Sequence, residues 1–206
     1  MASAGLRDRK KASVKAALVE QALRLFATRG FDGVTVDEIA AAAGVSRRSF
    51  FRYFPTKEAV VLERREVELA SLKALLESPL PGEAPFATIR RALLALSKHH
   101  SAERRTILAE QVLVRTTPSL MARDFEVDRA FERALVARLL AEGRHTAAEE
   151  RRARILAAAV VGAVRVTIEE WSDRGGDLDL RRLGEDALEF LAPLAPQAKR
   201  EGRRRA

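Results

Sequence analysis

The chain has 206 residues, of which 47% are hydrophobic and 32% charged, and its net charge is +8, a composition typical of a folded globular protein. It contains no cysteine, which excludes disulfides and metal sites built on thiolates. The longest apolar run, residues 155–164, is too short to cross a bilayer, and basic residues interrupt the N-terminus where a signal peptide needs an apolar core. We therefore expect a cytoplasmic protein with no membrane partner.

The excess positive charge lies at the two ends of the chain. Residues 1–58 contain 11 Lys and Arg against 6 Asp and Glu, and residues 199–206 contain 5 against 1. Positive charge at one end of a nearly neutral body is typical of a nucleic-acid-binding module, although a merely hydrated basic surface is the alternative. We expect residues 1–9 to form a flexible basic arm and residues 199–206 to form a disordered basic tail.

Apolar residues recur at helical spacing along most of the chain, and Gly or Pro separates many of the segments. Leu, Ala, Arg and Glu dominate the composition, so the pattern predicts an all-α fold. About nine helices are expected, over residues 10–29, 35–43, 46–54, 56–77, 86–97, 102–115, 118–141, 147–173 and 178–191. The fourth is long enough to carry motion from the C-terminal part of the chain to the N-terminal part.

The second and third predicted helices begin with side chains that can cap them. Thr35 and Glu38 have the spacing of a capping box, and Ser46 stands immediately before the third helix. Gly44 permits the left-handed backbone conformation that ends the second helix. The sequence therefore predicts two short helices joined by a tight turn.

The third predicted helix carries arginines and aromatic residues on different faces. Arg48 and Arg52 are four residues apart and share one face, with Arg47 beside them. Phe50 and Phe54 are also four apart and share the opposite, buried face. A short helix that buries aromatic rings and offers guanidinium groups outward suits insertion into a DNA major groove. The alternative is an ordinary surface helix with two core aromatics.

Four spaced motifs in this region resemble the TetR family of bacterial transcriptional regulators. They lie at residues 25–31 (LFATRGF), 35–40 (TVDEIA), 44–46 (GVS) and 51–59 (FRYFPTKEA), within a match over about residues 10–62. The resemblance implies an all-helical homodimer that binds a palindromic operator in double-stranded DNA, usually as a repressor. It also implies that a small ligand in the C-terminal domain releases the protein from DNA.

The same resemblance predicts how the chain divides by function. Residues 1–58 would form a helix-turn-helix DNA-binding domain, and residues 59–198 a helical bundle for ligand binding and dimerisation.

The family's DNA contacts fall, on this sequence, on Thr35, Val36, Ser46, Arg47, Arg48, Ser49, Phe51, Arg52, Tyr53 and Lys57. The two helix caps would meet phosphates through their hydroxyls and the helix amides. Residues 47–49 would read base edges, and their arginines lead us to expect G·C pairs in each half-site. Tyr53 and Lys57 would clamp phosphates. Phe51 stands where the family usually has tyrosine, so we expect it to touch a thymine methyl or a sugar instead.

The C-terminal half is similar, in residues 104–105, 155–159, Trp171 and residues 175–177, to a subgroup that senses acyl-coenzyme A-like molecules. Such an effector, a small apolar or acyl ligand, needs an apolar tunnel between helices. Candidate lining residues are Leu94, Ile107, Leu108, Val112, Phe125, Phe131, Leu135, Val161, Val164 and Trp171. Each of them is also a candidate for ordinary core. No other cofactor is expected.

Small residues are frequent in the helix over residues 147–173 and would allow another helix to approach closely. Together with the last helix it could form a four-helix interface across a two-fold axis. Candidate interface residues are Leu156, Ala159, Gly162, Ala163, Val166, Leu180, Leu183, Ala187, Leu188 and Leu191. The alternative is that these residues fill the core of a single chain.

No motif indicates catalysis, since the chain has neither a glycine-rich phosphate loop nor a nucleophile turn, and we do not expect an enzyme. We expect no metal site, because His99 and His100 point about 100° apart on a helix. Two alternatives to the ligand-released repressor stay open. One is a DNA-binding regulator controlled by a partner protein, and the other is a helical acyl-group carrier or enzyme without specific DNA binding.

Overall fold

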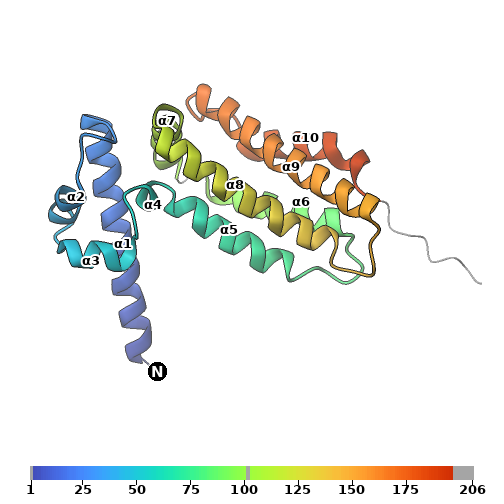
Figure 1. Cartoon of the computed structure of the whole chain (residues 1–206), viewed down its shortest axis with the longest axis horizontal. Helices are drawn as coiled ribbons and strands as arrows, with labels where there is room; N and C mark the ends of the chain where they lie inside the picture. Colours follow the sequence, from blue (N-terminus) through green and yellow to red (C-terminus); the bar gives the residue numbers. More distant parts are fainter. Residues whose placement is uncertain (1, 101–102, 197–206) are drawn as a thin grey trace, which may run out of the picture. The chain divides into compact units, whose positions relative to one another are not determined.

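The computed structural model describes residues 2–100 and 103–196, so the basic tail expected over residues 199–206 lies outside the described part. Within these ranges the chain is all-helical and has no strand, which confirms the predicted fold class (Figure 1). The ten α-helices are α1 (Ala2–Arg29), α2 (Val36–Ala42), α3 (Arg47–Tyr53), α4 (Glu58–Val61), α5 (Glu63–Leu76), α6 (Pro85–Leu96), α7 (Arg104–Thr116), α8 (Pro118–Leu139), α9 (Ala147–Asp173) and α10 (Leu180–Leu191). Two short 3-10 helices are η1 (Ser97–His99) and η2 (Ala192–Leu194).

Helix α1 begins at Ala2, so the expectation of a flexible basic arm is wrong for residues 2–9. Ala, Leu, Arg and Lys in this segment favour helix, and the single Gly5 disfavours it too weakly to interrupt it. Gly30, with φ 73°, ends the helix as predicted. The basic residues at the N-terminus therefore extend a helix of 28 residues.

The helix predicted over residues 56–77 is wrong as one continuous element, because the chain interrupts it at Leu62. This residue has φ −93° and ψ 6°, and it separates α4 from α5. Ala59, Val60, Val61 and Leu62 are all buried. Four consecutive residues point in all directions around a straight helix, so burying them together favours an interruption. The break accounts for ten helices where about nine were expected.

The described residues form two compact units, residues 2–68 with 103–127 and residues 69–100 with 128–196. Helices α5 and α8 contribute residues to both. This division differs from a single cut after residue 58, because α7 and the first turns of α8 share a hydrophobic core with the N-terminal helices.

The core of the first unit contains side chains from α1 to α4 together with Leu113 of α7 and Leu120 of α8. The aromatic rings pack in tilted pairs, with ring centres 5.0 Å apart for Phe26 and Phe31 and 5.8 Å apart for Phe50 and Phe54. Because α1, α2 and α3 all contact this core, the short helices α2 and α3 are held by packing rather than by their own propensity.

In the second unit, α9 and α10 pack along one another. Helix α9 begins with a complete capping box between Thr146 and Glu149. Near its other end the buried Trp171 donates from Nε1 to the carbonyl oxygen of Leu178, at 3.1 Å, and so anchors the turn that leads to α10. The pair forms one face of the second unit's core.

None of the helices in residues 2–100 and 103–196 combines the length and the apolar character that crossing a membrane requires. In the same residues, no group of three or more His, Cys, Asp or Glu side chains is placed to hold a metal ion.

Candidate nucleic-acid interface

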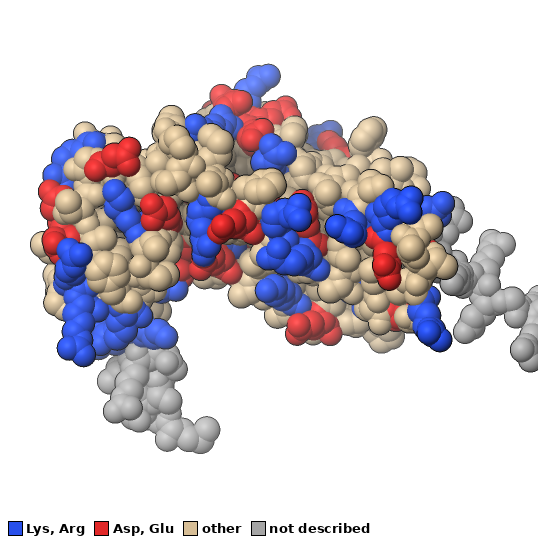
Figure 2. Space-filling model, viewed as in Figure 1, with Lys and Arg blue, Asp and Glu red and all other residues tan. Residues whose placement is uncertain are grey.

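Helix α3 is anchored at its start by a cap and along one face by aromatic rings. Ser46 accepts a hydrogen bond at its Oγ from the backbone N–H of Ser49, at 3.1 Å. Phe50 and Phe54 are 0% and 1% exposed, which confirms that this face of the helix is buried. The opposite face, with Arg48 and Arg52, is exposed. On the side shown in Figure 2, Lys and Arg side chains gather beside α3 and the adjoining part of α1.

The three arginines of α3 differ in their partners. Arg47 forms an ion pair with Asp37 of α2, at 2.7 Å, and its guanidinium lies 5.4 Å from the ring centre of Phe51. Arg52 donates to the Tyr53 hydroxyl at 3.3 Å, and its guanidinium lies over the Tyr53 ring. Arg48 is exposed, and within the described residues its side chain has no hydrogen-bond or ion-pair partner. Arg48 is therefore the arginine of this helix that is free to meet a base.

Phe51 contributes an apolar surface beside these arginines. Its side chain is 44% exposed, and its ring packs edge-on against Phe50 with centres 5.5 Å apart. The ring offers no hydrogen-bond donor, which is compatible with the predicted contact to a methyl group or a sugar.

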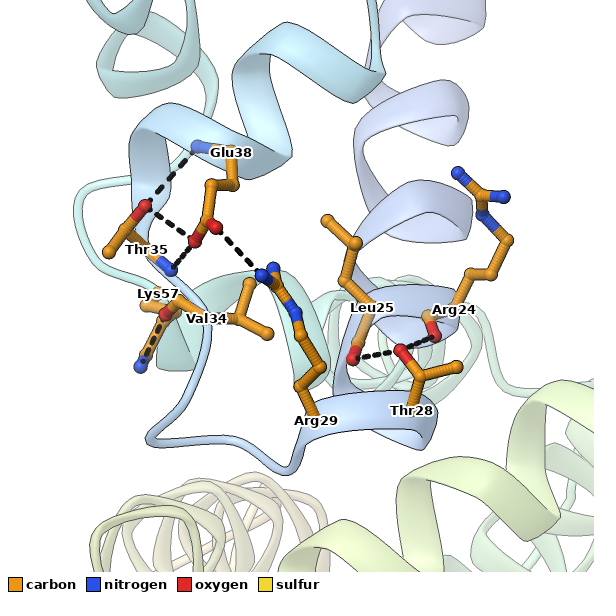
Figure 3. A network of polar contacts seen from close by, with 8 residues as sticks. All are labelled: Arg24, Leu25, Thr28, Arg29, Val34, Thr35, Glu38 and Lys57. Carbon is orange, nitrogen blue, oxygen red and sulfur yellow. Dashed lines mark hydrogen bonds and ion pairs between the residues drawn. The ribbon is translucent and has the colours of Figure 1, made fainter.

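A polar network joins the end of α1 to the start of α2 (Figure 3). The Thr35 backbone N–H and hydroxyl both donate to Glu38 Oε2 at 2.8 Å, and Arg29 Nη1 donates to Glu38 Oε1 at 2.7 Å. The hydrogen bond from Arg29 and those from Thr35 hold the pKa of Glu38 at about 2. The predicted capping box is confirmed, and the arginine that completes it was not predicted, because its partner is nine residues away in a different helix.

Hydrogen bonds within the two helix caps limit which atoms at the start of α2 and α3 can bind a phosphate. The hydroxyl hydrogens of Thr35 and Ser46 are already donated, to Glu38 at 2.8 Å and to Ser49 Oγ at 3.1 Å. The first-turn amides of a helix, here that of Val36 and its equivalent in α3, have no acceptor within the helix. Of the amides and hydroxyls that the sequence suggested for phosphate contacts at these caps, the backbone amides are therefore the donors that remain available.

Lys57 occupies a structural position rather than an open surface. Its Nζ donates to the carbonyl oxygens of Phe31, at 2.7 Å, and Val34, at 3.0 Å, and lies 4.2 Å from the centre of the Phe31 ring (Figure 3 shows the bond to Val34). The two carbonyls use two of the three N–H donors of the ammonium group, and the predicted phosphate clamp stays a prediction. Sequence reasoning missed these acceptors because they are backbone atoms 26 and 23 residues away.

Comparison with known proteins finds matches over most of the chain. The family model described as bacterial regulatory proteins of the tetR family matches residues 18–63, and the model of the MftR C-terminal domain matches residues 83–196. The HTH-type transcriptional regulator TcmR from Streptomyces glaucescens is 32% identical over 198 residues, 92% of this chain and 87% of TcmR. The chain belongs to the TetR family. It is a DNA-binding transcriptional regulator.

The chain is also similar to two further regulators. The putative mycofactocin biosynthesis transcriptional regulator MftR from Mycobacterium tuberculosis is 32% identical over 114 residues, 55% of this chain and 58% of MftR. FadR from Thermus thermophilus, a TetR-family repressor solved in complex with lauroyl-CoA, is 26% identical with a TM-score of 0.57. The match covers 90% of this chain and 96% of FadR.

The residues predicted to line an effector tunnel are divided between the two units. Ile107, Leu108, Val112 and Phe125 belong to the first unit and the other six to the second. Val112 and Phe125 are each 62% exposed, so neither lines an enclosed space within this chain. On α7 the buried stripe runs through Ile107, Glu110 and Leu113, and Val112 falls outside it. The tunnel stays a prediction.

The residues predicted for a TetR-type dimer interface also separate into two groups. Leu156, Leu180, Leu188 and Leu191 are buried inside the single chain, which is the core role that the sequence left open. Leu156 lies on the buried face of α9, and Leu180, Leu188 and Leu191 lie on the buried face of α10. The other six are Ala159, Gly162, Ala163, Val166, Leu183 and Ala187, and they are partly or fully exposed.

Proposed function

We propose that this TetR-family regulator binds a palindromic operator as a homodimer, represses transcription from it and is released by an acyl-coenzyme A-like effector. The observation that carries the proposal is the geometry of α3. Phe50 and Phe54 anchor the helix in the core, and Arg48 is exposed without a partner in the described part of the chain.

The DNA-reading role follows from what each group on α3 can still bind. Arg48 has its full set of guanidinium donors available for the O6 and N7 atoms of guanine, the commonest specific arginine contact. Arg47 can join it if its exposed ion pair with Asp37 opens, which costs little because such surface pairs contribute about 0–1 kcal/mol. First-turn amides of α2 and α3 would hold the adjacent phosphates.

Two exposed apolar stripes support the dimer. On α9 the stripe consists of Ile155, Ala159, Gly162 and Val166, and on α10 and η2 it consists of Leu183, Ala187, Phe190 and Leu194. Each has spacings of four, three and four residues, which place its members on one face. Phe190 is 82% exposed, and a side chain at Gly162 would meet nothing within 4 Å in this chain. A second copy would bury both stripes in a four-helix interface.

The effector class rests on similarity. The C-terminal half matches the MftR C-terminal domain, and the similar FadR structure was solved with lauroyl-CoA. Because α5 belongs to both units, a ligand bound in the second unit can act on the first through this helix. The effector must bind the released state more tightly than the DNA-bound state, since equal affinity would shift nothing.

The test is selection of bound sequences from a random duplex pool at about 150 mM salt, which suppresses nonspecific phosphate binding. We expect a palindrome with G·C pairs in each half-site and half-site centres about 34 Å apart. A folded dimer that enriches no motif would overturn operator binding and favour the carrier or enzyme alternative.

A second arm adds lauroyl-CoA to the preformed protein–operator complex, with coenzyme A alone as the control. Release by lauroyl-CoA only would support the acyl effector. Retention of the complex with both compounds would overturn the effector class while leaving operator binding intact, and it would favour control by a partner protein.

A further inference from the structure

The second unit contains a cavity that none of the predicted tunnel residues borders. It has a volume of about 590 Å³ and lies between the C-terminal half of α5, the turn at Pro79 and the C-terminal half of α8. This volume falls within the range of about 300–1,000 Å³ that is usual for small-molecule sites.

Arg138 gives the cavity an unsatisfied buried charge. Its side chain lines the cavity and the residue is 8% exposed. The Nε and Nη2 atoms are buried and have no hydrogen-bond partner among the described residues. Its ion pair with Glu142 is 3.9 Å long, beyond hydrogen-bond distance, and the Glu142 side chain is 80% exposed. A buried guanidinium is costly unless an anion or several acceptors face it.

The rest of the lining is suited to an anion with an apolar body. Arg133 and Lys73 are exposed cations on the lining, opposed by one carboxylate on it, that of Glu77. An apolar wall is formed by Ala130, Ala134 and Ala137, which share one face of α8, and by Ala141, which lies just after the helix. Leu76 and Pro79 add apolar surface from the other side.

We propose that this cavity binds an amphipathic organic anion, whose carboxylate or phosphate pairs with Arg138 while its apolar part lies along the alanine face of α8. A planar guanidinium can hold either anion through two parallel hydrogen bonds. The shared chemistry is a compact oxyanion on an aliphatic tail. Binding itself follows from the cavity, whereas any effect of the bound anion on operator release rests on the function proposed above.

Isothermal titration of the full chain without DNA tests the site, with decanoate, decyl phosphate and neutral decanol as probes below their micelle concentrations. We expect at least one of the two anions to bind about tenfold more tightly than decanol, because the guanidinium prefers a charged acceptor. The stronger of the two identifies the head group. Equal binding of all three probes, or binding of none, would overturn the proposal, since a cavity filled by water alone predicts no preference.

Two variants place the binding in this cavity. Arg138→Met keeps an unbranched, flexible side chain and removes its charge, and Ala134→Trp fills the alanine face while retaining the arginine. Each variant should bind the preferred anion about tenfold more weakly or worse than the wild type does. Arg129→Met, which removes an arginine from the same helix outside the cavity, should leave the affinity unchanged.

Unchanged anion binding in both cavity variants would overturn the assignment to Arg138. Because Ala134→Trp retains the buried guanidinium, it keeps the test decisive if Arg138→Met fails to fold. A DNA selection without an enriched motif would contradict operator binding but would not affect these titrations, so the two proposals can be tested independently.

Discussion

At the scale of single residues, the three arginines of α3 differ in whether another side chain already holds them. Arg47 is held by Asp37 at 2.7 Å and Arg52 by Tyr53 at 3.3 Å, whereas Arg48 has no such partner in the described residues. An arginine that has no protein bond to break gains more from a new bidentate contact. Specificity is therefore expected to depend on Arg48 more than on its neighbours.

Arg48→Ala should weaken operator binding by about 1–3 kcal/mol and relax the preference at one base pair of each half-site. Arg48→Lys is the matched control, because it keeps the charge and loses the two-pronged geometry, so it should relax the preference while retaining nonspecific affinity. Fluorescence anisotropy on the selected operator and on single-base variants measures both. If Arg48→Ala left the ranking of sequences unchanged, the base-reading role would be wrong.

For Lys57, which lies beside the turn between α1 and α2, we predict an effect on stability. Lys57→Met should lower the free energy of unfolding by about 1–3 kcal/mol, because the carbonyl oxygens of Phe31 and Val34 lose their donor. Urea denaturation measures this loss, and Lys98→Met, at an exposed lysine, should change little. Normal stability, together with a weaker dependence of DNA binding on salt, would instead restore the phosphate-clamp role.

At the scale of elements, a buried ionic contact joins α5 to α7 within the first unit. Arg64 of α5 donates from Nε to Glu110 of α7 at 2.7 Å and from Nη1 to Glu68 at 2.6 Å. Glu110 is 2% exposed, and its Oε1 has no hydrogen-bond partner among the described residues. Burial raises the pKa of Glu110 to about 7, more than the Arg64 guanidinium lowers it.

This raised pKa predicts how stability changes with pH. Between the ordinary value of 4.5 and about 7, the folded protein holds a proton on Glu110 that the unfolded chain releases. The contribution of Glu110 to stability is therefore fully present below pH 4.5 and is lost as pH rises to about 7. Glu110→Gln, which is neutral throughout, should remove this decline, on the order of 1–3 kcal/mol.

Urea midpoints of the wild type and of Glu110→Gln, compared at several pH values across this window, measure the difference. Arg64 keeps its bond to Glu68 in the variant, so the comparison does not leave that guanidinium unpaired. Glu126→Gln, at an exposed carboxylate, is the control and should follow the wild type. Parallel curves for wild type and Glu110→Gln would show that Glu110 is ionised in the folded protein.

At the scale of the whole molecule, operator reading by the proposed dimer depends on the exposed faces of α9 and α10. The buried face of α9 includes Ala153, Val160 and Trp171, and Gly162 lies on the opposite side of the helix. A glycine that no neighbour in its own chain requires leaves room for close approach by another helix. Assembly therefore explains small residues that folding of one chain does not.

Gly162→Trp should yield folded monomers with weakened operator binding, because the indole fills the space that a second α9 would occupy. Sedimentation velocity measures the mass, and circular dichroism checks that the helices persist. Arg90→Trp, at an exposed position of α6, should remain dimeric. A Gly162→Trp protein that remained dimeric would place the interface on another surface.

The sequence alone determined the features that depend on neighbours three or four residues apart. Most helix positions, the cap at Ser46, the Thr35–Glu38 capping box and the buried pair Phe50 and Phe54 were predicted and are confirmed. Hydrogen bonds and side-chain stripes within a helix repeat at that spacing, so they can be read without knowledge of the fold.

Only the tertiary structure decided which groups are occupied and which are free. Arg47 meets an aspartate ten residues away, and Lys57 meets carbonyls 26 and 23 residues away, so the local pattern around either cation could not reveal its partner. The interruption at Leu62 and the buried Arg138 nitrogens without hydrogen-bond partners among the described residues likewise depend on what packs around them. Spacing along a chain decides which side chains share a face, whereas the partners across that face are set by the packing of distant segments.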